Sequence, residues 1–384
     1  MKNFIDLFSG AGGMSCGLEM VGMNCLLGID FDQSSLKTFQ ANHRTSQTIL
    51  GDLREITVEL IQEKIGNQTI DLICGGPPCQ GFSTIGTNDK QDHRNFLFFE
   101  FLRMVKAFKP NFIILENVTG LLSKRNESTL ALIINSFNQL GYTVDVKVLS
   151  AHHYGVPQAR RRTILLGNRF GVNNIYPEKK FKDSEKDPDS LPLPHTVEWA
   201  FNTLLEFEGQ TFNHDLKTAE IKNELERKRI HYIPEGQGIR YERDQLAYLP
   251  PSLWYDIDWK NIREERFRET KLKRLARYSH SGTINTNKTT YYHPTEDRYL
   301  TPREAAAIQS FPSNYIFYGT LSQQWRQIGN AVPPLLAASV GEAILKLDNL
   351  KNILEKCYSI SDFKTVRSDA FNYRFKEKIT EQQH

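Results

Sequence analysis

The sequence predicts an α/β protein: an open, largely parallel sheet with helices on both faces, accompanied by a smaller, irregular domain. Short apolar runs alternate with segments whose apolar residues recur at helical spacing. A glycine-rich turn follows the first of these runs, and the alternation stops after Gly167. The chain has 384 residues, of which 39% are hydrophobic and 24% charged, so it can form one large soluble domain and a small one.

The order of the apolar runs gives the expected elements. We expect strands at residues 4–8, 25–29, 48–52, 71–74, 112–115, 144–149 and 163–166. We expect helices at residues 14–21, 96–108 and 126–140, and a helix starting at residue 303. Residues 327–334 read as a glycine turn with two prolines, and residues 335–350 as an amphipathic helix that packs back on the sheet.

The first strand, the glycine turn at residues 9–13 and the following helix form a Rossmann-like, nucleotide-type pocket. The dinucleotide fingerprint is not met, because Ser15 occupies its last glycine position. Asp30, at the end of the second strand, is placed to accept hydrogen bonds from a ribose diol. Phe31 either stacks on an adenine or packs in the core. Asp52 either accepts from an exocyclic amine or caps the following helix.

Cys79 is the candidate nucleophile. Pro77 and Pro78 fix two successive φ angles after a buried strand, so the chain delivers this thiol along one stiff path. The alternative is a buried cysteine that packs as a small hydrophobe. Gly10, Asp30, Asp52, Cys79 and Glu116 all follow expected strands, and the carboxyl ends of parallel strands hold the ligand in such sheets. We therefore favour a catalytic site at this edge.

Cysteine usage and charge exclude several classes of protein. The five cysteines are scattered and form neither a disulfide framework nor a zinc pattern, so we expect no metal. Net charge is only +3, so nucleic-acid binding requires local clustering. Residues 260–277 carry eight Lys or Arg against three Glu, which indicates either a solvated helix face or a phosphate-contacting surface. The chain shows no signal-peptide or membrane-spanning pattern, and we expect a cytoplasmic protein with no membrane partner.

Six segments resemble the motifs of the cytosine-5 DNA methyltransferase family, especially its prokaryotic modification methylases, in the family's order. They are Phe8-Ser9-Gly10-Ala11-Gly12-Gly13, Pro77-Pro78-Cys79-Gln80, Glu116-Asn117-Val118, Gln158-Ala159-Arg160-Arg161-Arg162, Arg303-Glu304-Ala305-Ala306 with Gln309, Phe311 and Pro312, and Gly329-Asn330-Ala331-Val332. The resemblance implies a methyltransferase sheet that binds S-adenosyl-L-methionine and releases S-adenosyl-L-homocysteine. It also implies a catalytic domain at residues 1–174 and 296–350, a target-recognition domain at residues 175–295, and a helix end and polar tail at residues 351–384.

The resemblance also implies roles for individual residues. Cys79 would attack carbon 6 of cytosine, Glu116 would sit at ring nitrogen 3, Arg162 would bind the ring carbonyl, and Arg160 would orient the loop or a phosphate. The methyl-donor set would be Phe8, Gly10, Gly12, Gly13, Asp30, Phe31, Asp52, Pro78, Leu97, Asn330 and Val332. The DNA set would be Gln80, Ser83, Arg94, Gln158, Arg266, Lys271, Lys273, Arg274 and Arg277.

Double-stranded DNA is the partner that this resemblance implies, with the target cytosine flipped out of the helix. A restriction endonuclease of the same system would act without direct contact, and we expect a monomer. Three alternatives remain at this point. They are a tRNA cytosine-5 methyltransferase, a non-catalytic DNA-binding module on the same scaffold, and a dehydrogenase, against which the missing fingerprint argues.

Overall fold

The computed structural model describes residues 2–77 and 96–354, and the chain divides into two compact units. Unit 1 comprises Met1–Tyr154, Arg160–Lys180 and Ala331–His384, and unit 2 comprises Gly155–Ala159 and Phe181–Asn330. Residues 296–330, which the resemblance assigned to the catalytic domain, therefore cluster with unit 2.

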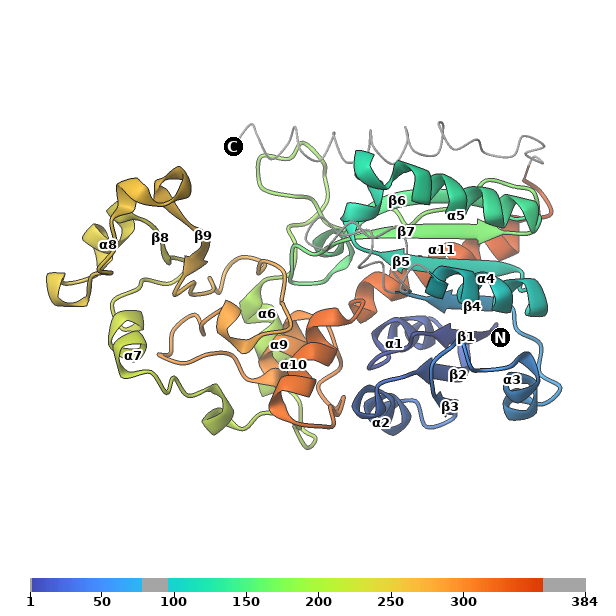
Figure 1. Cartoon of the computed structure of the whole chain (residues 1–384), viewed down its shortest axis with the longest axis horizontal. Helices are drawn as coiled ribbons and strands as arrows, with labels where there is room; N and C mark the ends of the chain where they lie inside the picture. The colour runs from blue at the N-terminus through green and yellow to red at the C-terminus, as the bar shows by residue number, and fades with distance from the viewer. Residues whose placement is uncertain (1, 78–95, 355–384) are drawn as a thin grey trace. The chain divides into compact units, whose positions relative to one another are not determined.

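A seven-stranded sheet forms the centre of unit 1, in the order β3-β2-β1-β4-β5-β7-β6 (Figure 1). Its strands are β1 (Asn3–Leu7), β2 (Asn24–Asp30), β3 (Gln47–Leu50), β4 (Leu72–Gly75), β5 (Phe112–Asn117), β6 (Thr143–Ser150) and β7 (Arg161–Asn168). The first five strands are parallel, whereas β7 runs antiparallel to both of its neighbours. The order reverses between β1 and β4, which is where ligands bind in open sheets of this kind.

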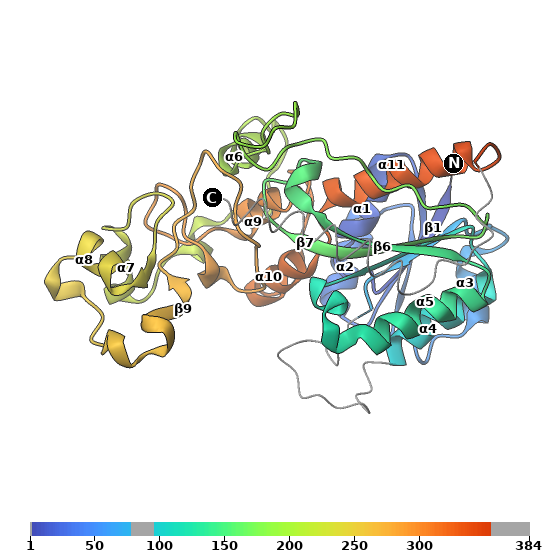
Figure 2. The ribbon, with the colours of Figure 1, turned by 90° about the horizontal axis from the view of Figure 1, so that it is seen from above.

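Helices cover both faces of this sheet, as the alternating pattern predicts. One face carries α3 (Val58–Ile65), α4 (Phe96–Phe108) and α5 (Glu127–Gln139), whose apolar residues share one buried cluster with Ile5, Leu27 and Ile73 of the strands. The other face carries α1 (Gly13–Met20), α2 (Gln33–Asn42) and α11 (Pro334–Leu350) (Figure 2). On this face a Cβ at Gly28 of β2 would lie 2.5 Å from the ring of Phe39 in α2, so glycine permits the close approach.

The last helix returns to the sheet beside the first. A Cβ built on Gly17 of α1 would lie only 2.1 Å from the carbonyl oxygen of Pro334, so this glycine allows α11 to pack directly on α1. The helical run Leu321–Leu350 is long and apolar enough to cross a membrane, but 78% of its apolar window is buried inside the protein. Burial of this kind is typical of core helices such as α11.

Unit 2 has little regular structure, as expected from the loss of the β/α alternation. It contains α6 (Val197–Leu205), α7 (Glu224–Ile230), β8 (Ile239–Tyr241), α8 (Glu242–Tyr248), β9 (Arg266–Lys271), α9 (Pro302–Ile308) and α10 (Leu321–Asn330). Strands β8 and β9 pair antiparallel. A second apolar cluster, which includes Ile230, Ile239, Trp259 and Leu272, holds these elements together.

The prediction of a glycine turn at residues 327–334 is wrong for residues 327–330. Helix α10 continues to Asn330, and Gly329 lies inside it. A Cβ at Gly329 would lie 2.5 Å from the carbonyl carbon of Asn285, so this glycine is needed for close packing within unit 2 and not for a turn.

Candidate active site

Glu116 and Arg162 form an ion pair at the carboxyl edge of the sheet, with 2.7 Å between Arg162 Nε and Glu116 Oε1. Glu116 is the penultimate residue of β5, and Arg162 is the second residue of β7. Because these two strands are antiparallel, the start of β7 lies beside the end of β5, with Asn117 opposite Thr163. Two motifs 46 positions apart in the sequence therefore meet at one point.

Burial controls the electrostatics of this pair, whose side chains are only 14% and 13% exposed. Loss of solvent raises the pKa of Glu116, and the nearby guanidinium groups of Arg162 and Arg160 offset part of that rise. Burial also lowers the pKa of Arg162, while Glu116 acts in the opposite direction. A carboxyl group with a raised pKa beside a cation can hold a proton and present it to a ring nitrogen.

The start of the nucleophile segment is fixed against the same carboxyl group. A Cβ at Gly76 would lie 2.8 Å from Glu116 Oε2, so a larger residue there would have to displace the Glu116 carboxyl group. Asn117 Nδ2 donates a hydrogen bond to the carbonyl oxygen of Pro77 at 3.1 Å, and Asn117 is buried. The chain thus leaves Pro77 in a defined position beside the Glu116–Arg162 pair. Cys79 and Pro78 lie outside the described residues.

The glycine turn after β1 is held by Asp30. One carboxylate oxygen of Asp30 accepts a hydrogen bond from the Gly10 N–H, and the other accepts from the Asp32 N–H, each at 2.8 Å. Gly10 and Gly12 adopt positive φ angles of 54° and 86°, and Phe8 adopts one of 67°. A positive φ in a non-glycine residue is strained, and such strain is common at ligand sites.

Three further features suit a nucleoside ligand in this loop. Phe31 is 73% exposed, so it is not a core aromatic and its ring is available for stacking. The Ser9 hydroxyl is buried and has no hydrogen-bond partner among the described residues. The carboxylate of Asp52 accepts from the backbone N–H and the guanidinium of Arg54, and α3 is capped by Thr57, so Asp52 does not cap that helix.

The other residues of the methyl-donor set are distributed more widely. Leu97 is partly buried on α4, and Gly13 begins α1. Val332 is buried beside a small apolar cavity that Met14 of α1 also lines. Asn330 ends α10 in unit 2 and is exposed.

Several residues of the DNA set have structural partners within unit 2. Gln158 is fully buried, its amide oxygen accepts from the Ile284 N–H, and its amide nitrogen donates to Gln309. The buried guanidinium of Arg274 donates from all three nitrogens, including to the carbonyl oxygens of Ile230 and Ile233. Neither side chain faces solvent, and a direct DNA contact for Gln158 and Arg274 stays a prediction.

The remaining residues of the DNA set differ in whether their side chains already have partners within the protein. Lys273 Nζ donates to the carbonyl oxygen of Gly236 at 2.6 Å. Arg277 pairs with Glu235, Arg266 pairs with Glu264, and Lys271 is exposed. Gln80, Ser83 and Arg94 lie outside the residues that the structure describes.

The sequence named Asn117 and Ser9 only as members of motifs and assigned no role to either residue. Asn117 fixes the backbone before the candidate nucleophile, and Ser9 offers a buried hydroxyl beside the donor loop. The available signal was position: Asn117 directly follows Glu116 at the end of a strand, where successive side chains point to opposite faces of the sheet.

Comparison with known proteins points to one family of enzymes. Residues 2–346 match the model of the family C-5 cytosine-specific DNA methylase. The chain is 33% identical over 361 residues to the type II methyltransferase M1.HphI of Haemophilus parahaemolyticus, covering 90% of this chain and 87% of that protein. It is 33% identical over 380 residues to the type II methyltransferase M.DdeI of Desulfomicrobium norvegicum, covering 89% and 88%.

A solved structure matches the fold as well. It is the crystal structure of a prophage-encoded Escherichia coli protein described as a DNA modification methyltransferase. It superposes with a TM-score of 0.67 at 25% sequence identity and covers 91% of this chain and 100% of the other. The similarity therefore extends over both units and is not confined to the sheet.

Proposed function

Because the chain belongs to the C-5 cytosine-specific DNA methylase family, we propose that it is the modification methyltransferase of a type II restriction-modification system. Its substrate would be a specific duplex DNA sequence, in which it methylates carbon 5 of one flipped-out cytosine. The relatives that share a third of its residues are named type II methyltransferases. The observation that carries the proposal is the buried Glu116–Arg162 pair beside the start of the nucleophile segment.

The chemistry follows from the weak reactivity of cytosine. The Cys79 thiolate would add to carbon 6, which makes carbon 5 nucleophilic enough to accept a methyl group. Glu116, whose pKa is raised by burial, would hold a proton at ring nitrogen 3 as charge develops on the ring. Arg162 would donate to the ring carbonyl oxygen while it keeps Glu116 in position. After methyl transfer to carbon 5, loss of the carbon 5 proton to solvent and elimination of the Cys79 thiolate would release 5-methylcytosine.

When bound, S-adenosyl-L-methionine supplies an electrophilic methyl group at its sulfonium sulfur. The loop from Ser9 to Gly13 would contact its methionine portion through backbone groups, and the buried Ser9 hydroxyl would gain a partner there. Asp30 would accept from the ribose and Phe31 would stack on the adenine, which its exposure permits. Asp52 would take the adenine amine in competition with Arg54.

The remaining assignments follow from this role. Double-stranded DNA would be the partner, and a cognate endonuclease would cut unmodified sites without contacting this protein. The enzyme would work as a cytoplasmic monomer, since each DNA strand of a site presents its own target cytosine. Arg160, fully buried just before β7, would keep the start of that strand in place.

Bisulfite sequencing of DNA from cells that express the protein tests this proposal and reveals the target site. We expect protected cytosines in a single short sequence, and no such protection in cells that express Cys79→Ser. Protection that persists in the Cys79→Ser cells, or methyl transfer to tRNA but not to duplex DNA, would contradict it.

A further inference from the structure

The turn between β3 and α3 carries Asp52, the acceptor proposed for the adenine amine of the methyl donor. At the start of this turn, the Gly51 N–H donates a hydrogen bond to the carbonyl oxygen of Asp30 at 3.1 Å. Residues 51–57 lie in no helix or strand. Segments of this kind are mobile unless other elements hold them. The position of the Asp52 carboxylate therefore depends on what holds the far part of the turn.

Arg103 of α4 holds that far part. Its Nη2 donates to the carbonyl oxygens of Leu53 and Ile56, at 2.8 and 2.9 Å. These acceptors lie 50 and 47 positions before Arg103, so the link is tertiary and not local. The side chains of Leu53 and Ile56 are buried in the same apolar cluster as Phe98 of α4. Arg103 thus joins the turn to a helix of the central core.

The guanidinium of Arg103 is itself held in one orientation. Its Nε donates to Glu100 Oε2 at 2.7 Å, one helical turn earlier. Hydrogen bonds from a charged donor stabilise more than neutral ones, and the planar guanidinium donates in a fixed geometry. The Arg103 side chain is nevertheless 37% exposed. It can therefore be replaced without opening a cavity in the core, and its replacement reports on the turn.

The carboxylate of Asp52 is an ionised acceptor in this turn. Arg54 donates to it from the backbone N–H, Nε and Nη2, at 2.9, 3.0 and 2.6 Å. These hydrogen bonds lower the pKa of Asp52. The two side chains are 49% and 30% exposed, so the pair is weak and a ligand amine can compete for the carboxylate. Arg54 belongs to the same turn and cannot fix that turn in space, whereas Arg103 comes from another element.

We propose that Arg103 is a positioning residue for the methyl donor, which holds the turn so that Asp52 accepts from the exocyclic amine of adenine. Arg103 itself contacts neither the donor nor the cytosine. Because the turn is ordered when the protein folds, donor binding does not have to order it, and affinity rises. This inference rests on the proposed DNA methyltransferase function and adds to it a residue that controls how selectively adenine is bound.

Calorimetric titration with two ligands tests the inference. One ligand is S-adenosyl-L-homocysteine, and the other is its analogue in which hydrogen replaces the exocyclic amine of adenine. The proteins are wild type, Arg103→Ala, Arg103→Lys, Asp52→Ala and the double variant with alanine at both positions. Steady-state methyl transfer to duplex DNA gives the KM of the donor and kcat separately. Circular dichroism confirms that each variant is folded.

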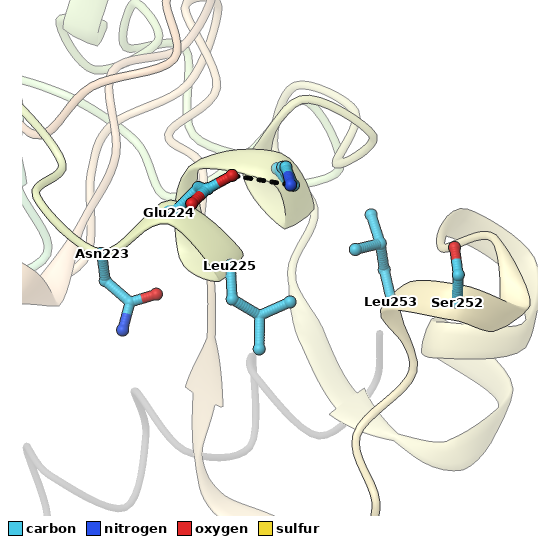
Figure 3. Close-up of a pocket in the computed structure, with 6 residues that line it drawn as sticks. Asn223, Glu224, Leu225, Ser252 and Leu253 are labelled. Atoms are coloured by element: carbon cyan, nitrogen blue, oxygen red, sulfur yellow. Dashed lines mark ion pairs between the residues drawn. The ribbon is translucent and has the colours of Figure 1, made fainter.

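Two control variants separate this effect from a general loss of positive charge. Arg169→Ala is the matched control in unit 1, because Nη1 of this arginine also donates to a backbone carbonyl, that of Lys109 at 2.9 Å. Lys228→Ala is the control in unit 2, where Lys228 pairs with Glu224 at 2.7 Å. Figure 3 shows this pair at the edge of an open hollow between α7 and residues 251–253. Both variants should bind the two ligands as wild type does.

We expect wild type to bind S-adenosyl-L-homocysteine roughly tenfold more tightly than the analogue, since only the former donates to Asp52. Arg103→Ala should remove most of this difference by weakening the natural ligand alone, and Arg103→Lys should keep part of it. In the Asp52→Ala background, Arg103→Ala should cause no further loss. The KM of the donor should rise roughly tenfold in Arg103→Ala, while kcat at saturating donor stays near that of wild type.

An equal loss of affinity for both ligands in Arg103→Ala would make Arg103 a general support of the fold and would overturn the inference. Undiminished discrimination in that variant, or a loss that adds to that of Asp52→Ala, would overturn it as well. If the alanine variant does not fold, Arg103→Lys is judged by the same comparison. A wild-type protein that binds neither ligand and methylates no DNA would instead reject the proposed function, so the two failures are distinguishable.

Discussion

Replacing Arg162 by alanine should make the stability of unit 1 depend on pH through Glu116. The variant leaves a carboxylate that is 13% exposed without its cation at 2.7 Å. Removing one partner of a buried pair costs about 3–5 kcal/mol. We take the lower end, about 3 kcal/mol at pH 8, since both side chains retain some contact with water.

The sign of the pH dependence follows from the direction of the shift. Burial raises the pKa of Glu116, so the folded protein binds a proton more tightly than the unfolded chain. The contribution of Glu116 to stability is therefore largest at acidic pH and falls as the pH rises through its folded-state pKa. Without Arg162 that pKa rises further, and the variant loses up to about 1.4 kcal/mol per pH unit over a wider range.

Urea unfolding of both proteins between pH 5 and pH 8.5, followed by circular dichroism, measures the effect. The stability difference should shrink as the pH falls, because protonated Glu116 needs no cation. In a Glu116→Gln background, the Arg162→Ala change should cost less and show no pH dependence. A difference that stays constant with pH in the Glu116 protein would refute the reasoning.

Three further changes test the packing around the site. Asn117→Ala removes the hydrogen bond to Pro77 at 3.1 Å, so single-turnover methylation should slow while the dissociation constant of the methyl donor stays unchanged. Gly17→Ala, although favourable for a helix, should lower the thermal unfolding temperature, because its Cβ would meet Pro334 at 2.1 Å and overpacking costs about 1–3 kcal/mol. Arg274→Ala should expose unit 2 to proteolysis, since buried carbonyl acceptors lose their donor at a cost of at least about 3 kcal/mol; protection equal to wild type would contradict that role.

The sheet and its carboxyl edge were predictable because they depend on apolar periodicity. Buried strands need apolar side chains, and strand ends of a parallel sheet meet at one edge wherever the helices go. That geometry places Glu116 at the same edge of the sheet as the glycine turn, and the structure adds its ion pair with Arg162.

Other features depend on contacts that no local pattern records. Gly329 looks like a turn residue, but its role is set by Asn285, 44 positions away. Arg274 looks like a surface cation, and only the tertiary structure shows that its guanidinium binds backbone carbonyls. The sequence gives the charge of a side chain, whereas its partners decide whether that charge can reach DNA.

The central claim is that Cys79 attacks cytosine beside the Glu116–Arg162 pair. Incubation with the methyl donor and a duplex that carries 5-fluorocytosine at the target, followed by peptide mapping, tests it most directly. The account predicts a covalent protein–DNA adduct on Cys79, at a rate that Glu116→Gln reduces. An adduct on another residue, or turnover of the normal substrate by Cys79→Ser, would contradict it.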